Sequence, residues 1–164
     1  MEINELYLKT AFCCMACDGD IANEELELVK QYASNSELFK GLEIEEKLNE
    51  YVSNINNEGQ NFLYSFVKDI ATADLSETEE LDVAKVAIQM IEADNKIEYS
   101  EISFFKKIRA KLSVSDDKLI ELFKEETLFD KFPEVEPEDF ILPDIVSNYD
   151  MNWNVSFKNI ELKM

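Results

Sequence analysis

This sequence contains no histidine, and that absence removes several classes of enzyme at once. Histidine is the most common general base, it completes the usual serine and cysteine triads, and it is a ligand in most zinc sites. No other set of residues in the chain describes a reaction. The sequence therefore predicts a protein that is not an enzyme.

Glycine and proline are also scarce, with three of each in 164 residues. Because these residues interrupt regular structure, their scarcity favours long helices over many turns. Hydrophobic residues make up 46% of the chain, too many for a disordered acidic tail. A chain of this length buries about 70% of its unfolded surface, so it needs no disulfide or metal to fold. We expect an all-α protein of ordinary domain size.

Positive charge is the third shortage, because 16 Lys and Arg face 36 Asp and Glu, for a formal net charge of -20. A field of this sign repels phosphate backbones and anionic lipids, so we expect no binding to nucleic acid or to a membrane. It attracts divalent cations and basic protein surfaces. The simpler interpretation is that most of the acidity only keeps the protein soluble.

Long hydrophobic runs are missing as well. No apolar stretch approaches the length of a membrane span. The first residues have neither the basic nor the apolar region of a signal peptide. These features predict a cytoplasmic protein.

The spacing of the apolar residues predicts about seven helices. Two stretches, residues 11–17 and 83–91, have almost no polar face, and helices of this kind are enclosed by other helices. The pattern that starts at Ser76 predicts a capping box, and Ser115 is expected to cap the last helix. The expected helices cover about residues 3–17, 23–33, 44–56, 60–73, 76–93, 99–112 and 115–123.

The chain repeats itself at an offset of 76 residues. Residues 17–21 align with residues 93–97, and Glu25 aligns with Glu101. Each copy places an apolar helix before an acidic loop and an amphipathic helix after it. We expect two pseudo-symmetric helix–acidic loop–helix units whose apolar helices meet at the centre of the bundle.

The composition changes after Lys124, because all three prolines and the only tryptophan lie beyond it. Proline at this density excludes a long helix, while the aromatic residues give the segment too much apolar surface to remain in water. We therefore divide the chain into a helical domain over residues 1–124 and an ordered arm over residues 125–164 that packs on the bundle. Alternation of apolar and polar residues around Trp153 predicts a short strand in this arm.

The first acidic loop has a partial likeness to a calcium-binding EF-hand. If Gly19 takes the place of the required glycine, Glu25 falls on the bidentate glutamate. The two leading carboxylate positions then become Cys14 and Ala16, which belong to an apolar helix. Since calcium needs most of these oxygens, the sequence does not predict an EF-hand.

The two loops carry a better match to a known family. The stretch Met-Ala-Cys-Asp-Gly-Asp-Ile at residues 15–21, followed by Asn-Glu-Glu at residues 23–25, resembles the TerB-like family of tellurite-resistance and stress-locus proteins. The second copy, over residues 91–97 with Glu101, is similar to the second acidic motif of that family. The resemblance covers about residues 3–124.

This resemblance implies a helical bundle in which the two acidic loops come together at a proposed metal site, with no established enzymatic reaction. Domains of the family also occur attached to co-chaperone J-domains. The sequence departs from the family pattern at Asn95 and Lys96, where a glycine and an acid are more typical. Lys96 brings a positive charge that would weaken a cation site. Nothing in the resemblance implies that this chain acts on tellurite.

The candidate site is the set of carboxylates in and beside the two loops, which would bind a divalent cation such as Ca²⁺ or Mg²⁺, or a basic partner. If the loops meet, like charges at short range are costly without a counter-ion. The alternative is structural, because acids in the first turn complement the helix dipole and aspartates stabilise tight turns. The candidate residues are Asp18, Asp20, Glu24, Glu25, Asp94, Glu98 and Glu101, with Glu92 beside them.

Cys14 and Cys17 form a CxxC pattern, with Cys13 beside it. Redox and soft-metal sites usually place a cysteine at a helix N-terminus, where the dipole stabilises the thiolate. Here the cysteines lie in the C-terminal half of a helix, where the dipole opposes the thiolate. We expect all three thiols to be buried and reduced.

Two functions remain open. The first is a binding or sensing module of a stress-response type that uses its acidic loops. The second is a structural or adaptor protein whose C-terminal arm or apolar groove binds another protein, while the loops only shape the fold.

Overall fold

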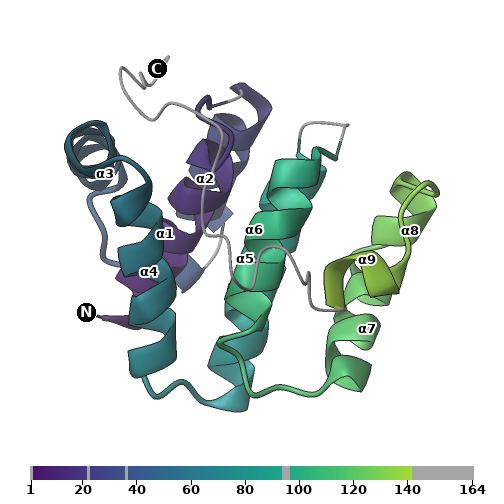
Figure 1. The fold of residues 1–164 in the computed structure, drawn as a ribbon. Helices are drawn as coiled ribbons and strands as arrows, with labels where there is room; N and C mark the ends of the chain where they lie inside the picture. Colours follow the sequence, from purple (N-terminus) through teal and green to yellow (C-terminus); the bar gives the residue numbers. More distant parts are fainter. Residues whose placement is uncertain (1, 22, 36, 94–96, 142–164) are drawn as a thin grey trace.

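The computed structural model of the protein describes residues 2–21, 23–35, 37–93 and 97–141. These residues form a bundle of α-helices (Figure 1) and contain no β-strand, which confirms the predicted all-α class. The elements in chain order are α1 (Ile3–Ala16), α2 (Asn23–Asn35), the 3-10 helix η1 (Glu37–Phe39), α3 (Ile44–Glu58), α4 (Gln60–Thr72), α5 (Glu77–Glu92), α6 (Tyr99–Arg109), α7 (Asp116–Glu125), α8 (Leu128–Lys131) and α9 (Pro137–Ile141).

Local signals in the sequence explain where two of the helices begin. At the start of α5, the Glu79 N–H donates to Ser76 Oγ at 3.2 Å, and the Ser76 N–H donates to Glu79 Oε1 at 2.9 Å. At the start of α7, Ser115 Oγ accepts from the Lys118 N–H at 3.3 Å. These bonds satisfy N–H groups that a helix N-terminus otherwise leaves unpaired, and both predicted caps are confirmed.

Helices α1 and α5 form the centre of the bundle. Residues 11–17 are all buried, and residues 83–91 are buried except for Lys85 and Gln89, which are partly exposed. Helix α1 packs more extensively on α5 than on any other helix, and Figure 1 shows α5 between α4 on one side and α7 on the other. The predicted central layer is therefore confirmed, and its lack of a polar face is explained by contacts on all sides.

Aromatic rings fill the space between α1 and its neighbours α3 and α4. The ring centroid of Phe12 lies 5.5 Å from that of Tyr51 and 5.8 Å from that of Phe62. The three side chains come from three different helices, and all of them are buried. Edge-on contacts of this kind add to the stabilisation from the buried area itself.

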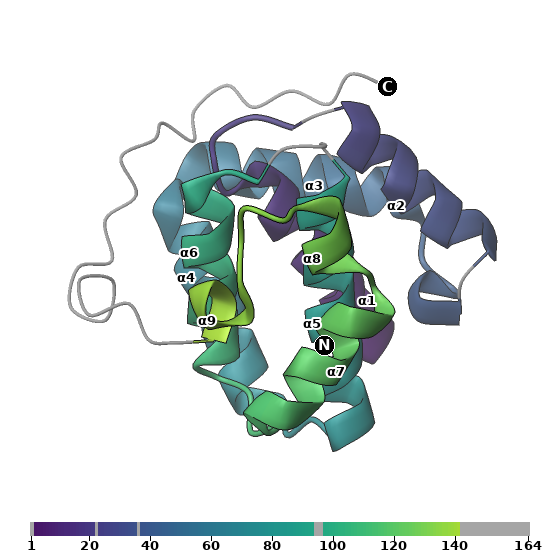
Figure 2. The ribbon, with the colours of Figure 1, turned by 90° about the vertical axis from the view of Figure 1, so that its right-hand side faces the viewer.

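A second group of aromatic rings joins the end of the described chain to the bundle. Phe140 of α9 is completely buried, and its ring centroid lies 5.8 Å from Phe105 of α6 and 5.6 Å from Phe123 of α7. Phe129 of α8 lies 5.8 Å from Phe123. Figure 2 shows α8 and α9 on the side of the molecule formed by α5, α6 and α7. Residues 128–141 therefore belong to the packed structure.

Helices α8 and α9 were not among the predicted helices, and their length explains why. They have four and five residues, too few to show a helical repeat of apolar positions. In α9, Pro137 occupies the first helical position, where its missing N–H is not needed and its φ already suits a helix. Proline thus starts a short helix here although it excludes a long one. The predicted strand around Trp153 lies outside the described residues, and the division at residue 124 stays a prediction.

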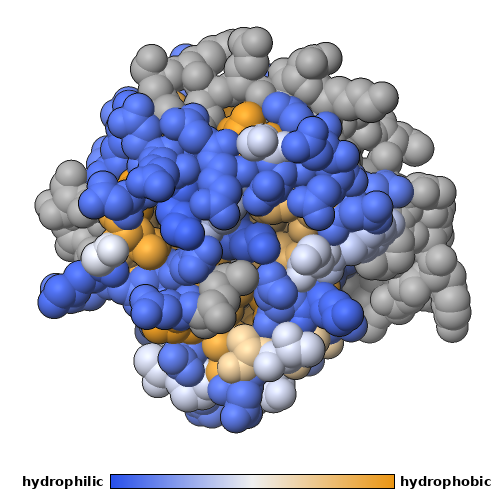
Figure 3. All heavy atoms as spheres, turned by 90° about the vertical axis from the view of Figure 1, so that its left-hand side faces the viewer, coloured by the Kyte–Doolittle hydropathy of each residue, from blue (hydrophilic) through white to orange (hydrophobic). Residues whose placement is uncertain are grey.

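The described surface is mainly polar. Figure 3, which shows the side of the molecule at the left of Figure 1, is largely hydrophilic with small separated hydrophobic areas. Within the described residues, Tyr99 is the one large hydrophobic side chain that is exposed. A search of the described helices finds none with both the length and the hydrophobicity to cross a membrane.

Candidate functional site

The loop after α1 is a tight turn held by its own aspartates. Gly19 has a φ of +90°, a conformation that favours glycine. The Asp20 N–H donates to Asp18 Oδ1 at 3.0 Å, and the Ile21 N–H donates to Asp20 Oδ1 at 2.9 Å. These bonds stabilise the turn. This is the role that the two aspartates have if the loops are purely structural.

Glu25 of α2 and Glu101 of α6 occupy corresponding positions in the two units, the third residue of each helix. Both are buried, with an exposed fraction of 5% each. The Glu98 N–H donates to Glu101 Oε1 at 2.9 Å, so Glu101 has the position and bond of a capping-box glutamate. Glutamate is rarely buried to this extent. Their burial therefore distinguishes these two carboxylates from ordinary acids in the first turn of a helix, which are exposed.

The two buried glutamates lie near the same end of α1. Burial raises the pKa of the Cys14 thiol, and the charges of Glu25 and Glu101 raise it further. Burial also raises the pKa of Cys17, and the same two carboxylates again add to the shift. Because charge interactions weaken with distance, both glutamates lie close to these thiols. One glutamate comes from each unit, and both act on the same two thiols at the end of α1.

Asp18 and Glu98 are a second pair of acids that come from different units. Desolvation raises the pKa of Asp18, and the charges of Asp20 and Glu98 raise it further, while hydrogen bonds from backbone N–H groups oppose the shift. Asp18 follows α1, and Glu98 directly precedes α6. The loop after α1 therefore lies beside the start of α6, as Figure 2 also shows.

The remaining predicted residues lie apart from this group or outside the described chain. Glu24 is exposed on the first turn of α2. Glu92 turns toward α8, where Lys131 Nζ donates to Glu92 Oε2 at 3.0 Å. Asp94 lies outside the described residues. Within the described chain, no three carboxylates or thiols form a group suited to a metal ion, so a Ca²⁺ or Mg²⁺ site that includes Asp94 stays a prediction.

The three cysteines are buried next to this acidic group, and all are free thiols, as predicted. The Cys17 Sγ donates to the Cys14 carbonyl oxygen at 3.4 Å. Burial raises the pKa of Cys13 as it does for the other two thiols, so the reactive thiolate is disfavoured at every position. The CxxC pattern is therefore part of the core of α1.

We expect the native protein to react with a thiol reagent far more slowly than the unfolded chain. Access to the three thiols requires opening of the central layer, and their raised pKa keeps the thiolate population low. The absorbance of the group that the reagent releases on reaction with a thiol, followed with and without denaturant, gives the two rates. Equal rates would contradict the burial of the cysteines.

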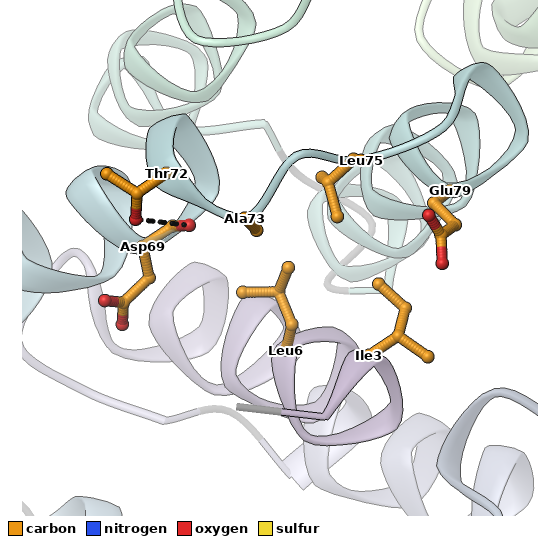
Figure 4. Close-up of a pocket in the computed structure, with 7 residues that line it drawn as sticks. All are labelled: Ile3, Leu6, Asp69, Thr72, Ala73, Leu75 and Glu79. Atoms are coloured by element: carbon orange, nitrogen blue, oxygen red, sulfur yellow. Dashed lines mark hydrogen bonds between the residues drawn. The ribbon is translucent and has the colours of Figure 1, made fainter.

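A pocket of about 350 Å³ lies at the opposite end of α1 from the acidic loops. It is formed by the first turns of α1, the end of α4 and the start of α5 (Figure 4). The apolar side chains of Ile3 and Leu6 form one side, and Leu75 faces them. The lining residues are Ile3, Leu6, Asp69, Thr72, Ala73, Leu75 and Glu79.

Two carboxylates stand on opposite sides of this pocket, Asp69 on α4 and Glu79 on α5 (Figure 4). Asp69 Oδ2 forms an ion pair with Lys9 Nζ at 3.1 Å. A pocket that combines a few apolar side chains with polar and acidic ones suits a ligand that carries both apolar and basic groups. The sequence predicts an apolar groove without locating it, because the lining residues come from three segments that only folding brings together.

Comparison with protein-family models, with curated proteins and with solved structures finds no match for this chain. The resemblance to the TerB-like family therefore stays a prediction.

Proposed function

We propose that this chain is a non-enzymatic binding or sensing module of a stress-response type, and that its paired acidic loops bind a divalent cation or a basic partner. The observation that carries the proposal is that Glu25 and Glu101 both raise the pKa of the Cys14 and Cys17 thiols near the end of α1. These acids come from corresponding positions of two units, and both are buried. Buried carboxylates near one helix end favour the approach of positive charge.

The exposed edge of the acidic group supports the same proposal. Asp18 is exposed, and Glu98 beside it is partly exposed, so a ligand can reach both from solvent. Carboxylate oxygens are the ligands that hard divalent cations prefer. A lysine or arginine side chain of a partner would be attracted by the same group of charges.

Adding Ca²⁺, Mg²⁺ or Mn²⁺ should raise the melting temperature, and Asp18→Asn should remove most of the rise. A cation at a hundred times its dissociation constant stabilises the native state by about 2.7 kcal/mol, which corresponds to about 5–10 °C for a chain of this length. Asparagine keeps the oxygen that accepts from the Asp20 N–H, so the turn itself is retained. Thermal melts with each cation, together with calorimetry, measure the effect.

Glu45→Gln is the matched control, because it removes one charge from the exposed first turn of α3. This variant should keep the cation-dependent rise in melting temperature.

The same rise should depend on pH. Because the pKa of Asp18 is raised, protons compete with the cation for this carboxylate at pH values above the usual titration range of an aspartate. The cation-dependent rise in melting temperature should therefore shrink as the pH falls. The absence of any cation-dependent rise, with Asp18→Asn less stable than wild type, would leave the loops as ordinary turns.

The alternative is an adaptor that binds another protein through an apolar groove. The pocket at the first turns of α1 favours this function, because its mixed lining of apolar side chains with the carboxylates of Asp69 and Glu79 suits a segment with apolar and basic side chains. In that case the acidic loops only shape the fold. The melts discriminate between the two functions, since the adaptor predicts no cation-specific rise.

A further inference from the structure

Four polar side chains meet where α5 and α7 end, next to α8. Gln89 and Glu92 lie three residues apart on one face of α5, Glu126 follows α7, and Lys131 is the last residue of α8. Gln89 Nε2 donates to Glu126 Oε2 at 2.9 Å, and Lys131 Nζ donates to Glu92 Oε2 at 3.0 Å. We name this cluster the Gln89–Glu92 site. Its two bonds join the end of α5 to the segment that contains α7 and α8.

Two oxygen atoms of this site, Gln89 Oε1 and Glu92 Oε1, are buried and have no hydrogen-bond donor. The Glu92 side chain is more than nine-tenths buried, with an exposed fraction of 8%. Gln89 cannot turn its amide over, because its oxygen would then face the Glu126 carboxylate, which also accepts. Lys131 already bonds the other oxygen of Glu92. A buried acceptor left without a donor is destabilising, so both atoms are candidates to bind a ligand.

The charges around the site do not balance. Glu92 and Glu126 supply two negative charges against the one positive charge of Lys131. The C-terminal ends of α5 and α7 add the negative ends of two helix dipoles. The last turn of α5 contains no basic residue, and that of α7 contains Lys124. Burial raises the pKa of Glu92, and the hydrogen bond and charge of Lys131 oppose this shift.

We propose that the Gln89–Glu92 site binds a monovalent metal cation, Na⁺ or K⁺, through Gln89 Oε1 and Glu92 Oε1. Both atoms only accept, so they fit a ligand that offers positive charge and no acceptor of its own. The excess of one negative charge matches a single positive charge. A divalent ion would place a larger positive charge beside Lys131, and Mg²⁺ in particular requires a near-octahedral set of ligands. The site does not depend on the acidic loops.

Melting temperatures in NaCl, KCl and choline chloride at equal ionic strength test the proposal. Choline screens surface charges to the same extent, but it is too large to reach two buried oxygens. We expect wild type to melt about 2–5 °C higher in one of the metal salts than in choline chloride. Equal melting temperatures in all three salts would overturn the proposal.

Two variants assign the effect to these residues. Glu92→Gln removes the charge and keeps the size of the side chain, and it should abolish the difference between the salts. Gln89→Met removes the second acceptor and should reduce the difference. Because each variant is compared with itself in the three salts, a less stable variant still gives an answer.

The matched control is Asp18→Asn, which removes a carboxylate of the acidic loops and should keep the full difference between NaCl or KCl and choline chloride. A difference that survives Glu92→Gln would overturn the assignment to this site. Binding at the acidic loops is tested with divalent cations and the Asp18→Asn variant, whereas binding at the Gln89–Glu92 site is tested with monovalent salts. Either proposal can therefore fail while the other holds.

Discussion

Replacing Phe140 with alanine should lower the free energy of unfolding by about 3–5 kcal/mol. Its ring is completely buried and contacts Phe105, Phe123 and Phe129, so the truncation removes apolar contacts and leaves a cavity. The melting temperature should fall by about 6–20 °C for a chain of this length. Urea unfolding, with the midpoint and the slope measured together, gives the change in free energy.

Phe140→Leu is the control for this prediction, because leucine fills part of the same space and should cost less than alanine. Phe129→Ala provides a second comparison. Because Phe129 is only partly buried, this change should lower the free energy of unfolding by less than Phe140→Ala. If Phe140→Ala cost less than about 1 kcal/mol, which is the range of ordinary surface changes, α9 would not be part of the core.

Replacing Glu80 with alanine should lower the free energy of unfolding by about 2–4 kcal/mol. The Ser113 N–H and the Val114 N–H both donate to Glu80 Oε1 at 2.8 Å, and the carboxylate is buried. This one oxygen holds the connection between α6 and α7 against the start of α5. Alanine would leave the buried Val114 N–H without an acceptor, which costs more than the loss of the bond alone.

Glu80→Gln separates the hydrogen bonds from the charge. Glutamine keeps an acceptor oxygen at the same distance from the backbone, so it should retain most of the stability and lose about 1 kcal/mol of charge assistance. Urea unfolding compares the variants, and hydrogen exchange of the Ser113 and Val114 amides reports the local bonds. Equal losses for glutamine and alanine would show that charge, and not the bonds, stabilises the connection.

The long helices could be predicted because their signals are local. The apolar residues of α1 and α5 have no polar gap, and the pattern at Ser76 marks the start of α5 without reference to any other segment. Helices α8 and α9 gave no such signal, since a helix of one turn shows no periodicity and depends on the ring of Phe140 for its place in the bundle.

The candidate site could be predicted only in part. The offset of 76 residues between the units indicated that Glu25 and Glu101 correspond, but the pattern held no information about their burial. Glu92 was placed beside the acidic loops because it is close to them in sequence. Its side chain lies on the face of α5 that meets α8, and its partner Lys131 is 39 residues further along the chain.

Glu80 was missed for a similar reason. Its acceptor oxygen serves backbone N–H groups 33 and 34 residues away, and backbone groups leave no mark in a sequence. An acid in the first turns of a helix is explained well enough by the helix dipole, so the pattern alone offers no reason to expect burial. Only the tertiary path of the α6–α7 connection distinguishes Glu80 from its exposed neighbours.

The enclosure of α1 has a consequence for the order in which this protein can acquire its structure during synthesis. Helix α1 ends at Ala16, but its main partner α5 begins only at Glu77. While the chain is made from its N-terminus, the apolar surface of α1, its two thiols and the thiol of Cys17 that follows cannot be fully covered until α5 has left the ribosome. Contacts between segments so far apart also slow folding, because a long loop must close first. The best-protected part of the native protein is thus the part that stays uncovered longest in the nascent chain.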